Sequence, residues 1–281
     1  MSMKKIKSST LLKMLSYIFL LVGFIIILFP FYLTIITAFK TSQESSANFF
    51  AFPKSIYWDN FLGVFKKANY LMYFKNSVII TVTSVCLILG LVPLCAYAIA
   101  RNMKIKYYSF IYIYLLAGIF VPFQVIMVPL VKYLSKMNMT NIQGLIVMHI
   151  TLASSQGVFL LVNYIRTLPR DMEEAAAIDG CTTFKIYYKI VLPLMKPMLA
   201  TICVMNALWV WNDFQMPLLI LNQSPTMWTL PLFQFNFKSQ YTYDYNMAFA
   251  SYLIAMVPVM IVYACAQKHI VSGLTQGAVK S

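Results

Sequence analysis

Glu173-Glu174-Ala175-Ala176-Ala177-Ile178-Asp179-Gly180-Cys181 is a polar stretch in an otherwise hydrophobic chain, and it is the starting point for predicting the rest of the fold. Half of the chain's eight acidic residues lie in it or just before it, namely Asp171, Glu173, Glu174 and Asp179. Long apolar runs flank it on both sides. The charge predicts a water-exposed segment between two membrane-spanning helices.

Local rules predict that this stretch begins with a short helix. Pro169 breaks the preceding segment, and Asp171 stands three residues before Glu174, the spacing of a capping box, so Asp171 should be the N-cap. The acidic residues then lie in the first turn, where the helix dipole favours them. Gly180 can adopt the left-handed conformation that ends the helix.

A second short helix, Phe184 to Ile190, should follow with Thr182 or Thr183 as its cap, before Leu192-Pro193 turns the chain back into apolar sequence. The three alanines give this elbow a small face that could fit a cleft on another protein. Its carboxylates could meet Arg or Lys side chains there. The spacing is equally compatible with an amphipathic loop that only joins two spans.

Composition places the chain among membrane proteins, because 60% of its 281 residues are hydrophobic and only 11% are charged. A spanning helix needs about 20 mostly apolar residues to cross about 30 Å of hydrocarbon. We therefore predict an all-α membrane protein with six transmembrane helices, at approximately Met14–Phe39, Asn76–Ala100, Tyr107–Val131, Ile142–Ile165, Leu194–Leu219 and Met247–Ala266.

The basic residues orient these spans. With the N-terminus inside, 14 of the 22 Lys and Arg residues lie in inner segments, although the first outer loop holds five lysines. An even number of crossings then makes both termini cytoplasmic and puts the elbow, between spans four and five, in the cytosol. The net charge of +14 is scattered over the span ends, which is typical of contacts with membrane lipid and not of nucleic-acid binding.

Polar residues inside the spans are candidates for a substrate pathway. In the third span Pro122 and Pro129 should each kink or break the helix, so Gln124 between them could line a water-filled path. In the fourth span the small and hydrogen-bonding residues at 151–157 favour helix packing. The first outer loop should hold a short interfacial helix within Trp58–Ala68.

The fifth span is the most polar, with amide, indole and carboxylate side chains of the kinds that bind sugars: Asn206, Trp209, Trp211, Asn212 and Asp213. Asp213 lies about 28 Å along the helix from Leu194, near the far edge of the hydrocarbon core. Asn206 and Trp209 lie deeper and are the better pathway candidates, with helix packing as the alternative for Asn206. We find no metal-binding or catalytic set, and we expect His149 to be a hydrogen-bonded helix histidine.

Glu174-Ala175-Ala176, Asp179-Gly180, Ile190, Leu192-Pro193 and Pro197 resemble the EAA loop with which the permease subunits of bacterial ABC importers dock on their ATPase. From Phe61 onward the chain is similar to carbohydrate-importer permeases of the MalG type, with Cys181 where that family usually has Ala. The other matching stretches are Asn76-Ser77, 96–101, Pro122-Phe123-Gln124, 211–214, Gly273-Leu274 and 277–280.

This resemblance implies a subunit that pairs with a second, homologous permease, two ABC ATPase subunits and an extracytoplasmic solute-binding protein in a bacterial cytoplasmic (inner) membrane. The predicted spans and the EAA loop together divide the chain into a cytoplasmic N-terminal segment (1–13), a first transmembrane helix (14–39), an outer loop (40–75), a permease core (76–268) containing the EAA loop (166–193), and a cytoplasmic tail (269–281). The implied ATPase-coupling residues are Glu173, Glu174, Ala175, Ala176, Ala177, Asp179 and Gly180.

The chain itself carries no phosphate-binding loop of the G-x-x-x-x-G-K-[ST] type, because no Gly is followed by Lys. We therefore expect a transport subunit that is not an enzyme and holds no cofactor, with ATP and Mg²⁺ on its partners. Two alternatives remain: an ABC permease for a glycerol phosphate or polyol ester, which would favour a cationic lining, and an ion-coupled secondary transporter, which would favour ionisable groups deep in the spans.

Overall fold

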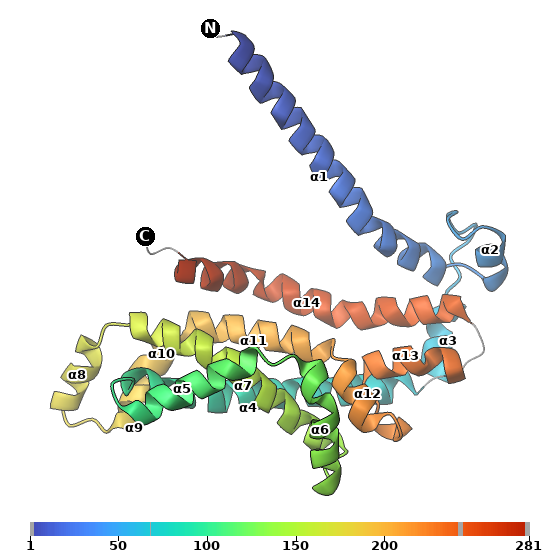
Figure 1. The fold of residues 1–281 in the computed structure, drawn as a ribbon. Helices are drawn as coiled ribbons and strands as arrows, with labels where there is room; N and C mark the ends of the chain where they lie inside the picture. The colour runs from blue at the N-terminus through green and yellow to red at the C-terminus, as the bar shows by residue number, and fades with distance from the viewer. Residues whose placement is uncertain (1–2, 68, 241–243, 279–281) are drawn as a thin grey trace. The chain divides into compact units, whose positions relative to one another are not determined.

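The computed structural model describes residues 3–67, 69–240 and 244–278, and they form helices joined by turns (Figure 1). The helices divide between two compact units. The first comprises residues 1–70 and 234–256, and the second comprises 71–233 and 257–281.

The first unit contains α1 (Met3–Ala38), α2 (Ser42–Ala47) and α3 (Asp59–Lys67), with the end of α13 (Leu230–Gln240) and the start of α14 (Tyr245–Ala278). α3 confirms the helix predicted within Trp58–Ala68. Side-chain hydrogen bonds fix the end of α1. The Asn246 amide donates to the carbonyls of Thr37 (2.8 Å) and Lys40 (3.0 Å). The Asn60 amide donates to the Lys40 carbonyl as well, at 2.8 Å.

The second unit is built around two long helices, α4 (Tyr70–Arg101) and α7 (Ile142–Thr167). They approach closely where Gly157 of α7 faces Val92 of α4, since a Cβ at Gly157 would lie 2.8 Å from a Val92 methyl. α5 (Lys106–Ile119) packs on α7 with a similar close approach of Gly118 to Ser155. These contacts confirm that small residues of the fourth predicted span serve helix packing.

The chain after α7 returns through a series of short elements to α11, which packs along α7. The elements are α8 (Asp171–Ile178), α9 (Thr183–Ile186), the π-helical turn Tyr187–Val191, α10 (Leu192–Leu194), α11 (Lys196–Trp211), α12 (Gln215–Leu221) and the 3₁₀ turn Pro225–Met227. Buried residues of α4, α7, the elbow and α11 form one hydrophobic cluster, which includes Ile99, Ile165, Tyr187 and Ile202.

Four described helices are long and apolar enough to cross a membrane, within Leu12–Ala38, Tyr70–Arg101, Ile142–Thr167 and Tyr245–Ala264. Up to six crossings result if each of two bent helix pairs forms one span. The four single helices match predicted spans one, two, four and six.

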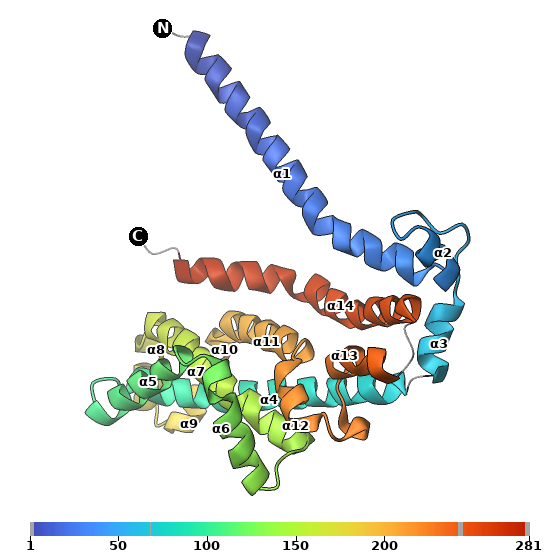
Figure 2. The ribbon, with the colours of Figure 1, turned by 45° about the vertical axis from the view of Figure 1, so that its right-hand side comes forward.

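Neither the third nor the fifth predicted span is a continuous helix. The break at Pro122 in the third span confirms the prediction, whereas the fifth span was predicted as one helix and is broken. α6 (Phe123–Lys136) turns by 105° from α5 at the break before Phe123, as both views show (Figures 1 and 2). Pro122 has no N–H to continue α5 and instead occupies the N-cap position of α6, whereas Pro129 lies inside α6 without ending it. The other bent pair turns by 74° at Met195, and a second break after Trp211 separates α11 from α12.

Candidate functional site

The elbow forms as two short helices, with one error in its predicted start. α8 begins at Asp171, so Asp171 is the first helical residue, and the N-cap position belongs to Arg170, which makes no side-chain cap bond. Arg170 already has helical backbone angles, and its carbonyl accepts hydrogen bonds from the amides of Glu173 and Glu174. The predicted Asp171 capping box is therefore wrong, but the acidic residues do lie in the first turn.

The turn between the two helices follows the sequence rules. Gly180 has a φ of +77°, the left-handed conformation expected where α8 ends. The Cys181 amide donates to the Ala176 carbonyl at 3.0 Å and closes the turn. The Thr182 hydroxyl accepts from the Lys185 amide at 3.4 Å and caps α9, which gives way to a π-helical turn at Tyr187 instead of continuing as an α-helix to Ile190.

The elbow has an inner and an outer face. Ala176 is buried among the hydrophobic cluster of the second unit, so this alanine anchors α8 to the helix bundle. Glu174, Ala175, Ala177, Asp179 and Gly180 are exposed. Two large apolar side chains, Ile178 at 88% and Phe184 at 69% exposure, lie beside them in the sequence. The exposed surface thus combines carboxylates with apolar groups, a composition suited to a protein contact.

Glu173 differs from its neighbour Glu174 because its side chain is only 13% exposed. It forms an ion pair with Arg101 at the end of α4, and it accepts a hydrogen bond of 3.0 Å from the Tyr97 hydroxyl. Tyr97 and Arg101 are four residues apart and so lie on one face of α4. The Glu173 carboxylate is thus engaged within the chain, an arrangement that the local sequence pattern of the elbow does not predict.

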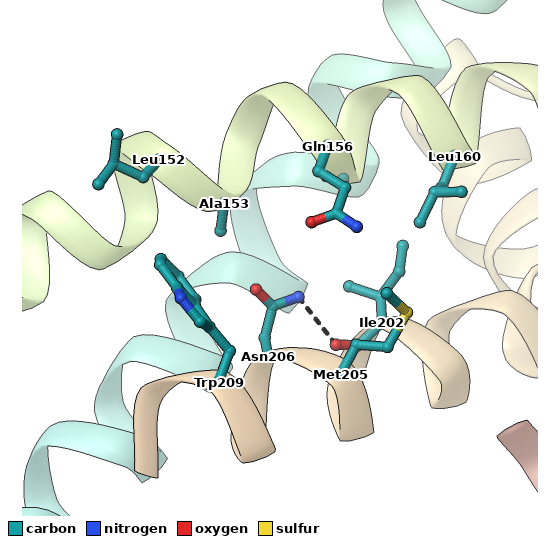
Figure 3. A pocket seen from close by; sticks show the side chains of 9 residues that line it. Leu152, Ala153, Gln156, Leu160, Ile202, Met205, Asn206 and Trp209 are labelled. Carbon is teal, nitrogen blue, oxygen red and sulfur yellow. Dashed lines mark hydrogen bonds between the residues drawn. The ribbon is translucent and has the colours of Figure 1, made fainter. Parts of the chain in front are cut away.

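A cavity of about 200 Å³ lies between α7 and α11 (Figure 3). The amide groups of Gln156, from α7, and Asn206, from α11, face it from opposite sides, and the Trp209 indole forms one end. Asn206 donates to the Ile202 carbonyl of its own helix at 2.9 Å. The full lining is Leu152, Ala153, Gln156, Gly157, Leu160, Ile202, Met205, Asn206 and Trp209.

The other predicted pathway residues lie outside this lining. Asp213 follows α11, accepts from the Met216 amide at the start of α12 (3.4 Å), and lies 3.0 Å from His149 Nε2. Asn212 is exposed and donates to the Leu208 carbonyl of its own helix at 2.8 Å. Gln124 lies in the first turn of α6 with an exposed side chain. Asn206 and Trp209 are therefore the two predicted pathway residues that the cavity brings together.

The comparisons with known proteins identify the family. The family described as "Binding-protein-dependent transport system inner membrane component" matches residues 92–276, more than half of the chain. The chain belongs to this family of permeases. The permease is 46% identical over 266 residues to the "Multiple sugar-binding transport system permease protein MsmG" of Streptococcus mutans, covering 94% of this chain and 96% of that protein.

A second relative of the permease is the "Probable starch degradation products transport system permease protein AmyC" of Thermoanaerobacterium thermosulfurigenes. It is 39% identical and covers 89% of this chain and 91% of its own length. The fold matches a crystal structure of a bacterial ABC transporter involved in the import of the acidic polysaccharide alginate, with a TM-score of 0.82, 20% identity, and coverage of 93% and 97% of the two chains. The family and the relatives make the permease an integral membrane transport component.

The positions of two residues beside the cavity were not predicted from sequence, although the expectation that His149 is a hydrogen-bonded helix histidine is confirmed by its 3.0 Å contact with Asp213. Gln156 stands among small residues at 151–157, a pattern that predicts helix packing, and it lines the cavity of the permease because its position on α7 faces α11. His149 contacts the Trp209 ring edge-on, with centroids 5.3 Å apart, and so lies directly behind a cavity residue. A helical-wheel comparison of α7 with α11 could have indicated that Gln156 and His149 lie on the face of α7 that contacts α11.

Proposed function

We propose that the permease forms the membrane pathway for a sugar or oligosaccharide in an ATP-driven importer whose ATPase subunits are separate polypeptides. The observation that carries the proposal is the cavity between α7 and α11, where two amides and an indole share one space. Amides can hydrogen-bond sugar hydroxyls, and an indole face packs against a sugar ring. The names of the two relatives above point to sugars as well.

The chemistry of the cavity argues against a phosphorylated cargo, because no Lys or Arg among the described residues lines it. It gives little support to proton or sodium coupling, since the lining holds no ionisable group. A neutral, hydroxyl-rich cargo fits this lining best.

The proposed assembly contains a second permease subunit, two ATPase subunits and an external solute-binding protein in the bacterial inner membrane. A binding protein is supported by a second solved structure of similar fold, a bacterial alginate ABC transporter in complex with an alginate pentasaccharide-bound periplasmic protein (TM-score 0.73, 17% identity). In our proposal the chain crosses six times, with both termini and the elbow cytosolic, and each bent helix pair counts as one crossing. The exposed elbow face meets the ATPase, whose closure on ATP reorients the helices around the cavity.

The test is reconstitution of the permease with its co-expressed partners in liposomes. We expect sugar uptake that requires the binding protein and ATP on the ATPase side, and no effect of an uncoupler. Uptake that an uncoupler abolishes and ATP depletion leaves intact would contradict the proposal. Replacing Trp209 with Ala and Gln156 with Leu should raise the half-saturating sugar concentration, whereas unchanged values for both would remove the cavity from the pathway.

A further inference from the structure

α4 is held by polar side chains at both of its ends. At the inner end Arg101 and Tyr97 bind the Glu173 carboxylate of the elbow. At the other end the Asn76 amide donates to the carbonyls of Thr226 (2.9 Å) and Trp228 (3.0 Å), in the segment that follows α12.

Ser77 reinforces the second tie, because its hydroxyl accepts a 2.8 Å hydrogen bond from the Leu230 amide at the start of α13. Asn76 and Ser77 are buried, at 9% and 3% exposure. Together these bonds fix the segment 226–230 to one end of α4. Buried hydrogen bonds of this kind are costly to break, since each leaves a backbone group without a partner.

The two ties are separated by the thickness of a membrane. Asn76 and Arg101 are 25 residues apart in one continuous helix, which spans about 38 Å at about 1.5 Å per residue, against about 30 Å for the hydrocarbon core. Pro93 lies inside α4 and does not interrupt it. A single continuous helix therefore joins the two sets of hydrogen bonds.

The contact of Glu173 with Arg101 and Tyr97 is suited to transmitting a movement of the elbow to α4. Arg101 and Glu173 are both partly buried, at 12% and 13% side-chain exposure, so solvent screens their attraction less than that of a surface pair. Loss of the Glu173 charge would leave the Arg101 guanidinium largely buried without its counter-ion. The Nε of Arg101 already has no hydrogen-bond partner among the described residues. The elbow would then keep its outer face and lose its polar attachment to α4.

We propose that α4 links the elbow to the segment 226–230, with Glu173, Arg101 and Asn76 as positioning residues that couple ATPase movement on one side of the membrane to the surface on the other. The inference rests on the proposed function, since it requires an ATPase on the elbow. The proposal gives the two adjacent glutamates different roles. Glu174 faces the ATPase, and Glu173 transmits the movement of the ATPase to the helix bundle.

The experiment uses the complete importer in liposomes and measures retained ATPase subunits, ATP hydrolysis with and without sugar-loaded binding protein, and sugar uptake per ATP. In Glu173→Gln and Asn76→Ala we expect the ATPase subunits to remain bound and the stimulation of hydrolysis by the binding protein to fall about fivefold or more. Arg101→Lys should retain part of the stimulation because it keeps the charge. Lys104→Gln, which removes an exposed cation near the same helix end, is the matched control and should behave as wild type.

The double variant Glu173→Gln/Asn76→Ala decides whether both ends belong to one connection. If they do, its loss should be no larger than that of the more severe single variant. Loss of ATPase subunits from Glu173→Gln but not from Glu174→Gln would overturn the proposal, as would unchanged stimulation or strictly additive losses. A wild-type complex that lacks binding-protein stimulation would instead contradict the proposed function itself.

Discussion

His149 of α7 and Asp213, which follows α11, form a buried pair with 3.0 Å between Nε2 and Oδ2. Their side chains are 1% and 8% exposed. Asp213 also accepts a hydrogen bond from the Met216 amide in the first turn of α12, and the His149 ring contacts Trp209 edge-on. One carboxylate thus joins three helices immediately behind the indole that lines the cavity.

Asp213→Leu should therefore destabilise the permease by about 1–3 kcal/mol, because it leaves a buried imidazole nitrogen without its partner. The measurement is the thermal unfolding temperature of the detergent-purified complex. Asn212→Leu is the matched control, since Asn212 is exposed and bonds only to its own helix. Equal unfolding temperatures for the two variants would mean that the His149–Asp213 pair contributes nothing to stability.

Trp209→Phe and Trp209→Ala should differ in their effect on sugar uptake. Phe keeps an aromatic face in the cavity for contact with a sugar ring, whereas Ala removes it. We expect the half-saturating sugar concentration to rise in the order wild type, Phe, Ala, with similar amounts of each protein in the membrane. Equal values for Phe and Ala, both above wild type, would argue that the indole N–H, and not the ring face, contacts the cargo.

Gly180→Ala should impair coupled uptake, because an L-residue at a φ of +77° costs about 1–2 kcal/mol and displaces the turn between α8 and α9. Gly180→Trp should abolish uptake and leave membrane insertion intact. Gly90→Ala is the control, since Gly90 lies within α4 and a Cβ there meets nothing within 4 Å. Normal ATP-dependent uptake by a stably inserted Gly180→Trp variant would refute the role of the elbow.

Lys40 offers a test of the first unit. Its side chain is buried, and Nζ donates to the carbonyls of Asn48 and Phe49, both at 3.1 Å. Lys40→Met removes both bonds at a cost of about 1–3 kcal/mol and should make the segment 41–58 more sensitive to added protease. Lys54→Met, at an exposed position nearby in the sequence, should leave the cleavage rate unchanged. Equal protection of both variants would contradict the anchoring role of Lys40.

Local rules predicted the parts of this fold that depend on neighbouring residues. Gly180 ends α8 and Thr182 caps α9 because a left-handed turn and a side-chain cap each depend on a few consecutive residues. Asp171 failed as a cap because Arg170, one residue earlier, already adopts helical angles, and a capping pattern does not fix the helix start to one residue.

Such local rules do not predict contacts between residues that are far apart in the sequence. Glu173 and Arg101 are 72 residues apart, and His149 and Asp213 are 64 apart. The first pair forms because α4 packs against the elbow, and the second because α11 packs along α7, so no spacing in the sequence marks either pair. The Pro122 break was predicted, whereas its angle of 105° was not.

The position of Ile178 relative to the membrane and the ATPase tests the central claim most directly. In a chain whose native cysteines are replaced, Ile178→Cys at the exposed elbow should react with a membrane-impermeant maleimide in inside-out vesicles only, and bound ATPase subunits should protect it. Ser46→Cys in α2 is the control and should react in right-side-out vesicles. Labelling of Ile178→Cys from the outside, or full labelling in the presence of the ATPase subunits, would contradict the account.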